Sequence, residues 1–251
     1  MPPTTDAHHT DLRFLLLQIR DADDPMRQQE VDCFTQALAC SPSQITLFDL
    51  LSGAPSDEAL RAADVVFIGG SGDYSVVSGG KWLNEALETM RRLVDLAVPT
   101  FASCWGFQAV ARALGGRVVT DLNRAEVGTH TLHLTAAGQT DPLFRQLGPT
   151  FLAQQGHQDI VDALPPSAVL LASSDRVECQ AFRIADKPIY CTQFHPELDR
   201  QALLTRVRQY PQYVERIAGI PFAEFEPQCQ ETPATSLLLR HFVSHMLAST
   251  R

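Results

Sequence analysis

The sequence lacks the features that membrane-spanning, secreted and nucleic-acid-binding proteins need. No apolar run comes near the ~20 residues that span a bilayer, and the first residues lack the basic-then-apolar order of a secretion signal. Lys and Arg number 20 against 29 Asp and Glu, and the resulting net charge of −9 has the wrong sign for binding a phosphate backbone. We therefore expect a cytoplasmic protein with no membrane and no nucleic acid among its partners.

The cysteines are irregularly spaced. The six cysteines form no Cys-x-x-Cys pair, and a chain of 251 residues can bury a core large enough to hold without disulfides. We expect free thiols in a reducing compartment. His241 and His245 stand four apart on an expected helix, but no third zinc ligand accompanies them, so the sequence predicts no metal site.

The first half of the chain alternates strands with helices. Apolar runs predict strands over 13–19, 44–50 and 64–68 and from residue 99, and helical spacing falls between them over 23–40, 56–63 and 81–96. Val65 to Ile68 are all apolar, as expected for a strand whose two faces are both covered by helices. This order predicts an α/β fold in three layers, with a doubly wound, mostly parallel sheet.

The second half has shorter strands, over 128–135, 150–154, 168–173, 179–184 and 188–194, which predict hairpins added to one edge of the sheet. After residue 198 the spacing turns helical again, over 200–210 and 236–248. We expect a disordered N-terminus (1–11), one α/β domain (12–198) and a helical C-terminal extension (199–251) that packs on the same domain.

The strongest chemical signal lies at the end of the fourth expected strand. In the segment FASCWGFQ, residues 101–108, a strand passes into a helix with no connecting loop. This is the pattern of a nucleophile elbow, with Cys104 in place of serine. The N-terminus of the helix favours the thiolate, and the amide of Trp105 is directed at a developing oxyanion. We predict that Cys104 is a nucleophile; the alternative is a buried core cysteine.

A second signal follows the last expected strand, where Pro196 separates His195 from Glu197. Side chains two residues apart in extended chain lie on one side, so Glu197 can accept a hydrogen bond from one imidazole nitrogen and turn the other toward a thiol. This is the nucleophile, base and orienter arrangement of a catalytic triad. The sequence therefore predicts His195 as general base and Glu197 as its orienter, with His157 as the competing base.

A third signal is the glycine turn GGSG, residues 69–72, at the end of the third expected strand. A turn beside the nucleophile strand can offer a second oxyanion donor, and the amide of Gly70 is the expected one; a plain glycine turn is the alternative. The turn is no nucleotide loop, because Ser75 and Trp82 occupy positions where a P-loop has Gly and Ser or Thr.

Together, the cysteine elbow, the glycine turn before it and the His-Pro-Glu after it resemble the class I (triad) glutamine amidotransferase family. The similarity covers roughly residues 12–198. The segment GHQD, residues 156–159, is similar to the segment near the glutamine pocket in free-standing members that resemble the glutaminase part of GMP synthase, or γ-glutamyl peptidases. Two positions depart from the pattern. The family usually has Gly where Ala102 stands, and a smaller residue or Tyr where Trp105 stands.

The resemblance implies a flavodoxin-like domain that hydrolyses the side-chain amide of glutamine through a γ-glutamyl thioester on Cys104, with no cofactor. It implies that Gln108 helps to hold the amino-acid end of glutamine and that His157 lies near the pocket. The implied partners are glutamine, or another γ-glutamyl small molecule, and a separate synthetase that accepts the ammonia. Two alternatives stay open: a γ-glutamyl peptidase acting on larger γ-glutamyl amides, and a retired amidotransferase fold used as a non-catalytic binding module.

Overall fold

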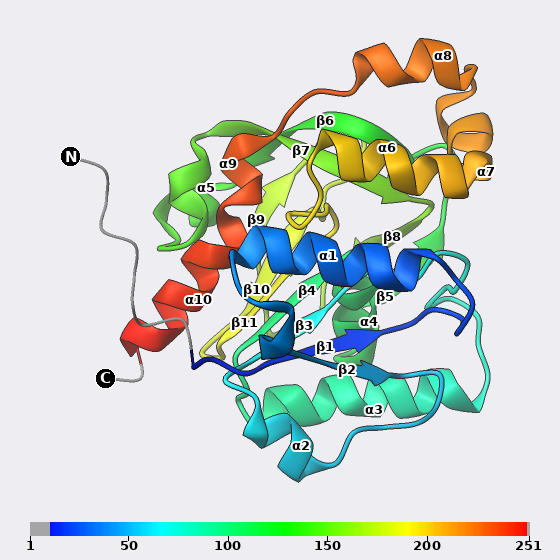
Figure 1. Ribbon diagram of the computed structural model, residues 1–251. Coiled ribbons are helices and arrows are strands. Elements are labelled where there is room, and N and C mark those ends of the chain that lie inside the picture. Colours follow the sequence, from blue (N-terminus) through cyan, green and yellow to red (C-terminus); the bar gives the residue numbers. More distant parts are fainter. Residues whose placement is uncertain (1–10, 250–251) are drawn as a thin grey trace.

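The computed structural model describes residues 11–249, and most of its strands form one large sheet (Figure 1). The order across this sheet is β2-β1-β3-β4-β11-β10-β9-β6-β7, and β5 pairs with β8 in a separate ribbon. The strands are β1 (Phe14–Gln18), β2 (Ile45–Asp49), β3 (Val65–Ile68), β4 (Thr100–Ser103), β5 (Arg117–Thr120), β6 (Glu126–Leu134), β7 (Thr150–His157), β8 (Asp159–Ala163), β9 (Ala168–Ser173), β10 (Ala181–Ile184) and β11 (Ile189–Thr192).

The sheet has a parallel part and an antiparallel part. Neighbours from β2 through β11 run parallel, with β4 between β3 and β11. From β11 outward, β10, β9, β6 and β7 are joined by antiparallel pairing. The predicted α/β class and the predicted hairpins on one edge are therefore confirmed. Because parallel strands end at the same edge, the segments that follow β3, β4 and β11 come together there.

Helices cover both faces of the sheet. The principal ones are α1 (Met26–Leu38), α2 (Asp57–Ala62), α3 (Lys81–Asp95), α4 (Trp105–Ala113), α6 (Arg200–Gln209) and α10 (Leu238–Ser249). Buried residues of α1 and α10 share one hydrophobic cluster with one face of β1 and β3, and those of α2, α3 and α4 share a second cluster with the other face. The predicted three layers correspond to these two helical layers and the sheet between them (Figure 1).

Two strands in the described residues escaped the sequence analysis. β5 and β8 pair with each other and not with the main sheet. Each is short, and β5 is exposed or half-buried along its whole length, so its sequence carries neither a long apolar run nor a clear alternation. β7 also extends three residues past the predicted end, because it pairs with β6 as far as His157.

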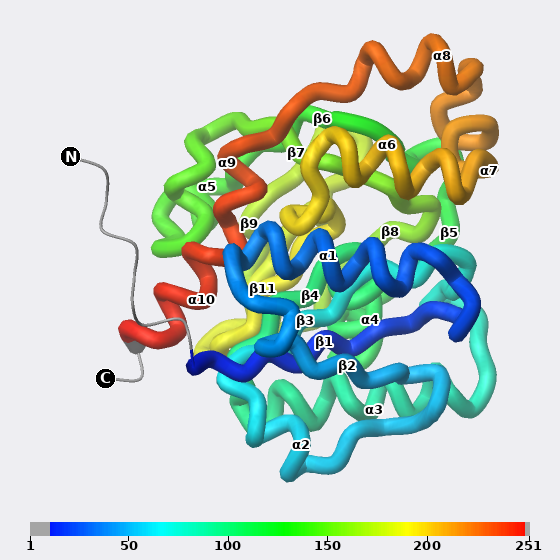
Figure 2. The backbone as a smooth tube through the Cα atoms, viewed as in Figure 1, coloured from blue at the N-terminus to red at the C-terminus, as the bar shows by residue number. Residues whose placement is uncertain are grey.

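The chain after α6 returns across the molecule. It passes through the short helices α7 (Pro211–Tyr213), α8 (Phe222–Phe225) and α9 (Pro233–Ser236) before α10 lies against α1, as the orange-to-red part of the tube shows (Figure 2). In α10, Phe242 is fully buried and packs edge-on against Phe101 of β4, with ring centroids 5.3 Å apart. The C-terminal helix therefore packs against the strand that leads to the cysteine elbow.

The predicted disorder of residues 1–11 lies outside the described residues, apart from Asp11. Within residues 11–249, no helix combines the length and the apolar character that crossing a membrane requires.

Candidate active site

Cys104 occupies a sharp turn between β4 and α4. Its backbone has φ 50° and ψ −101°, a conformation that a residue with a side chain adopts only under strain. The amide of Cys104 donates to Thr192 O of β11 (2.8 Å), and the amide of Gly106 donates to Gly69 O after β3 (3.3 Å). Both neighbouring strands thus hold the turn, and the cysteine side chain projects from the carboxyl edge of the sheet, as the elbow pattern predicts.

His195 lies beyond the end of β11 and faces the same cavity as Cys104. Its Nδ1 donates to Glu197 Oε1 over 2.6 Å, while its own amide donates to Gln154 O of β7 (3.0 Å). The thiol of Cys104 donates to Gly156 O at 3.8 Å. The structure therefore brings together the cysteine, the histidine and the glutamate that the sequence singles out.

The charges in this group shift its proton affinities. Burial by itself lowers the pKa of His195, but the carboxylate of Glu197 and the sulfur of Cys104 outweigh it and raise the pKa to about 9. Burial raises the pKa of Glu197, but His195 and then Arg206 reverse this and hold the pKa below its ordinary value. The arrangement thus favours a protonated imidazole next to an ionised carboxylate.

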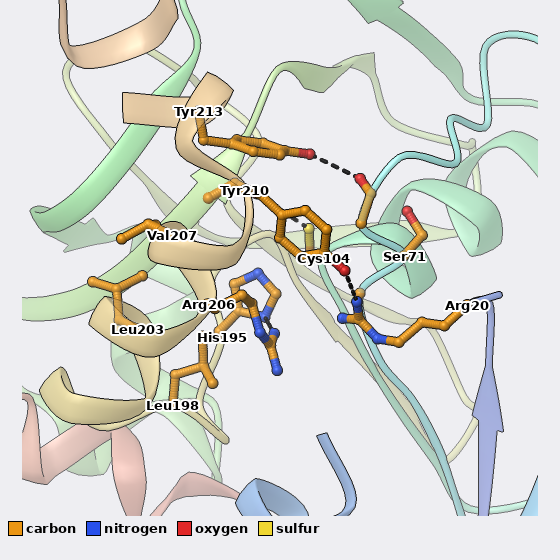
Figure 3. Close-up of a pocket in the computed structure, with 13 residues that line it drawn as sticks. Arg20, Ser71, Cys104, His195, Leu198, Leu203, Arg206, Val207, Tyr210 and Tyr213 are labelled. Atoms are coloured by element: carbon orange, nitrogen blue, oxygen red, sulfur yellow. Dashed lines mark hydrogen bonds between the residues drawn. The ribbon is translucent and has the colours of Figure 1, made fainter. Parts of the chain in front are cut away.

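The cavity above Cys104 is small, with a volume of about 50 Å³. Two tyrosines close it from the C-terminal side (Figure 3): Tyr213 donates to Gly72 O (3.0 Å), and Tyr210 accepts from Arg20 Nη1 (3.0 Å). The cavity is lined by Arg20, Gly70, Ser71, Gly72, Cys104, Gly156, His195, Leu198, Leu203, Arg206, Val207, Tyr210 and Tyr213. Cys104 is 8% exposed, so a substrate reaches it only through this narrow space.

The two expected oxyanion donors differ in their surroundings. The Trp105 amide is at the first position of α4, where no intrahelical acceptor exists. The Gly70 amide lines the cavity but donates to Glu30 Oε1 (3.1 Å). Glu30 is fully buried and is also paired with Arg20. An oxyanion on Cys104 could therefore use the Gly70 amide only after that amide leaves Glu30.

Gln108 and His157, expected near the substrate, do not line the cavity. The Gln108 amide nitrogen donates to Asp159 O (2.9 Å) and Gln193 Oε1 (3.1 Å). His157 is buried with Nδ1 3.1 Å from Asp159 O and Nε2 3.2 Å from Glu126 Oε2. Both side chains therefore form hydrogen bonds outside the cavity, whereas Gly156, next to His157, lines it.

Several cavity residues were missed by the sequence analysis, notably Arg20, Arg206, Tyr210 and Tyr213. The first lies after β1, and the others lie on or near α6 and α7, in the extension. No motif distinguishes them, because helical spacing does not show which polar residue faces a cavity made by another part of the chain. The one signal available in the sequence is that the helical segment of α6 follows directly after Glu197, which indicates that this helix begins near the active site.

No group of three or more His, Cys, Asp or Glu side chains within residues 11–249 is arranged to hold a metal ion. His130 and His133 of β6 have different partners: His130 Nε2 lies 3.0 Å from Val127 O, and His133 Nε2 lies 3.4 Å from Asp175 Oδ1.

The family model for "Glutamine amidotransferase class-I" matches residues 33–205, more than half of the chain. The chain belongs to the class-I glutamine amidotransferase family. The matched segment contains the elbow and the His-Pro-Glu sequence, so the family assignment and the geometry concern the same residues.

Curated relatives of this amidotransferase include a glutamine-hydrolyzing GMP synthase subunit of Methanothermobacter thermautotrophicus, 33% identical over 49% of this chain and 64% of that protein. The same-named subunit of Sulfolobus acidocaldarius is 34% identical over 57% of this chain and 72% of that protein. The glutamine-hydrolyzing GMP synthase of Caldicellulosiruptor saccharolyticus is 35% identical over 43% of this chain but only 20% of its own length. The matches to the Methanothermobacter and Caldicellulosiruptor proteins thus span less than two thirds of those relatives.

Solved structures show the same fold. A glutamine amidotransferase from Thermotoga maritima superposes with a TM-score of 0.74 at 20% identity, covering 95% of this chain and 99% of that one. A glutamine amidotransferase from Methylobacillus flagellatus gives 0.65 at 17% identity, covering 92% and 94%. Because each covers more than nine tenths of this chain, these likenesses extend past residue 205, where the family model ends.

Proposed function

We propose that this amidotransferase hydrolyses the side-chain amide of glutamine to glutamate and ammonia, with Cys104 as nucleophile, His195 as general base and acid, and Glu197 as orienter. The observation that carries the proposal is the shared cavity of Cys104 and His195, with His195 Nδ1 hydrogen-bonded to Glu197 Oε1 at 2.6 Å. A strained elbow, a base and an orienter in hydrogen-bond contact form the constellation of covalent acyl transfer.

In the first half of the reaction, the thiolate of Cys104 attacks the amide carbon of the substrate. The C–S bond forms as the carbonyl π bond opens, and the resulting oxyanion is stabilised by the Trp105 amide. His195 donates its proton to the departing nitrogen, the C–N bond breaks, and ammonia leaves. A γ-glutamyl thioester remains on Cys104.

In the second half, His195 is neutral and accepts a proton from water. The hydroxide attacks the thioester carbon, the C–S bond breaks, and glutamate leaves. Glu197 keeps the imidazole oriented and stabilises its protonated form in both halves. The Gly70 amide is the second oxyanion donor of the proposal, provided that it exchanges Glu30 for the oxyanion during the reaction.

The closure of the cavity supports a small leaving group. Tyr210 and Tyr213 close the space beyond Cys104, so a bulky leaving amine would have to displace them. Because the curated relatives include proteins named as one subunit of a GMP synthase, the proposal includes transfer of the ammonia to a synthetase on a separate chain.

The proposal treats the extension from residue 199 as part of the catalytic domain. Residues 203–213 of this extension supply one wall of the cavity. Removing the extension would therefore expose Cys104 to water as well as remove packing.

Steady-state release of glutamate from glutamine and from γ-glutamyl peptides, measured side by side on the purified chain, tests the proposal. We expect turnover of glutamine that is abolished in Cys104→Ala, with Cys40→Ala, at a half-buried cysteine outside the cavity, as the matched control. Preference for a γ-glutamyl peptide would replace the proposal with the peptidase alternative. If neither glutamine nor a γ-glutamyl peptide is turned over, and a γ-glutamyl chloroketone does not label Cys104, the alternative of a non-catalytic binding module would replace the proposal.

A further inference from the structure

A buried arginine, Arg206, lies beside the catalytic group and has no part in the reaction steps above. Arg206 of α6 lines the cavity with its side chain only 10% exposed, and its Nη1 lies 3.6 Å from Glu197 Oε1. The same nitrogen lies 3.5 Å from His195 Nδ1. Because that Nδ1 already donates to Glu197 Oε1, the imidazole forms a hydrogen bond with this carboxylate oxygen, and the guanidinium forms an ion pair with it (Figure 3 shows the imidazole and the guanidinium side by side).

The neighbouring helix α1 fixes the guanidinium in this place. Arg206 donates through Nε (3.1 Å) and Nη2 (2.9 Å) to Oε1 of Gln29, a residue of α1. Gln29 in turn donates to Ala202 O of α6 (3.0 Å). This leaves Nη1 as the end of the guanidinium that faces the catalytic pair. In the described part of the chain, Glu197 is the one carboxylate that forms an ion pair with Arg206.

Glu197 in turn has few other contacts. Its side chain is fully buried, and its second oxygen, Oε2, has no hydrogen-bond partner within the described residues. Burial by itself makes this carboxylate costly as an anion, and the charges of His195 and Arg206 together with its own backbone amide offset that cost. The nearest proton is on His195 Nδ1, 2.6 Å away, and its transfer to Oε1 would leave a neutral pair that no longer stabilises a protonated imidazole.

We infer that Arg206 is a positioning residue of the catalytic group: its guanidinium keeps Glu197 ionised, so that the proton between Glu197 and His195 stays on the imidazole. The consequence for turnover rests on the proposed function, whereas the electrostatic effect on Cys104 and His195 does not. Gln29 holds the guanidinium in this orientation by accepting two of its hydrogen bonds.

Other charged and titratable groups face this centre, and among residues 11–249 none duplicates Arg206. Arg20 is neutralised by Glu30 (3.3 Å) and Asp24 (3.2 Å), so it contributes little net charge. The remaining groups that face the pair from the packed elements are Cys104 of the elbow, Cys33 of α1, and Tyr210 and Tyr213 beyond α6.

The test removes the charge and follows the protonation of the catalytic pair without requiring turnover. The rate at which iodoacetamide alkylates Cys104 is measured from pH 5 to 10 by mass spectrometry of its peptide, in the wild type, Arg206→Gln and Arg206→Lys. Removing a cation raises the pKa of every nearby acid, so Arg206→Gln is expected to move the alkylation midpoint up by about one pH unit. Its kcat for glutamine should fall about tenfold, with KM within about twofold, since one pH unit corresponds to a tenfold change in equilibrium. Arg206→Lys, which keeps the positive charge, should return both the alkylation midpoint and kcat most of the way to their wild-type values.

Arg208→Gln is the matched control, because Arg208 lies on the same helix, exposed, and pairs with Glu226 away from the cavity. Its alkylation profile and kcat should equal those of the wild type. If Arg206→Gln does not fold, Gln29→Leu replaces it, with a smaller shift in the same direction expected. Lost activity with an unchanged alkylation profile would show Arg206 to be a packing residue and overturn the inference, as would no change in either measurement. An enzyme that turns over no γ-glutamyl substrate, but whose Cys104 profile shifts in Arg206→Gln, would refute the proposed function and leave the inference standing.

Discussion

Replacing Gly106 with Ala tests how tightly the elbow must be held. A Cβ at this position would lie 2.8 Å from Ile68 Cβ and Cγ2 and 3.0 Å from Ile68 O, against 3.4 Å or more for ordinary contacts. The Cβ and the backbone oxygen of Ile68 cannot turn aside, so the N-terminus of α4 must retreat from β3 by about 0.4–0.6 Å. That movement stretches the 3.3 Å hydrogen bond from Gly106 N to Gly69 O.

The two expected effects of Gly106→Ala differ in size. Overpacking of this kind typically costs about 1–3 kcal/mol, and alanine returns up to about 1 kcal/mol through its higher helix propensity, so the net loss of stability should be about 1–2 kcal/mol. Activity should suffer more, because the same shift moves Cys104 and the Trp105 amide together. Misplacement of reacting groups by about 1 Å costs on the order of 100-fold in rate.

Urea denaturation and steady-state glutamate release measure these two effects. Gly80→Ala is the matched control, because Gly80 also lies at a helix N-terminus, as the N-cap of α3, but a Cβ there would meet nothing within 4 Å. It should stay within about 1 kcal/mol of the wild type with unchanged turnover. If Gly106→Ala kept both wild-type stability and wild-type kcat/KM, the close approach of α4 to β3 would have no bearing on the elbow.

Three further substitutions probe the surrounding structure. Because the pKa of about 9 for His195 exceeds its ordinary 6.5, protonated His195 stabilises the fold below about pH 6.5, and this stabilisation is lost as pH rises toward 9. Glu197→Gln should abolish this pH dependence of stability, measured by urea denaturation at pH 6 and 9.5. An unchanged pH dependence would contradict the pairing of His195 with Glu197. Glu30→Gln should cost about 3 kcal/mol in urea denaturation because it leaves Arg20 buried without its main counter-charge, whereas a loss under 1 kcal/mol would show that Asp24 suffices. Phe242→Ala should cost about 3–5 kcal/mol because the ring is fully buried, and a much smaller loss would mean that α10 packs loosely.

The elbow and the His-Pro-Glu segment could be found from sequence because each is local. Cys104 is flanked by a strand and a helix whose patterns are visible within eight residues, and two-residue periodicity alone puts His195 and Glu197 on one side of the chain. The principal parallel strands could be found for a similar reason, since strands buried on both faces leave continuous apolar runs such as Val65 to Ile68.

The sequence failed where a position depends on a distant part of the chain. The Gly70 amide is expected to be an oxyanion donor, but nothing in the glycine turn shows that this amide donates to Glu30, forty residues earlier. Gln108 and His157 belong to segments adjoining the site, yet their side chains bond to Asp159 O instead of lining the cavity. A motif identifies a segment, whereas the direction of a side chain depends on the acceptors that packing provides.

The alternation of strands and helices, the cysteine at a strand-to-helix junction, and the histidine and glutamate two residues apart can all be found from the sequence alone. These are properties of neighbouring residues, which backbone geometry and the burial of apolar side chains dictate directly. Which of the chain's charges meet these residues depends on the tertiary fold: Glu30 meets the Gly70 amide, and Arg206 lies beside Glu197. A buried charge needs a partner within a few ångströms, and the folding of the whole chain determines which partner comes that close.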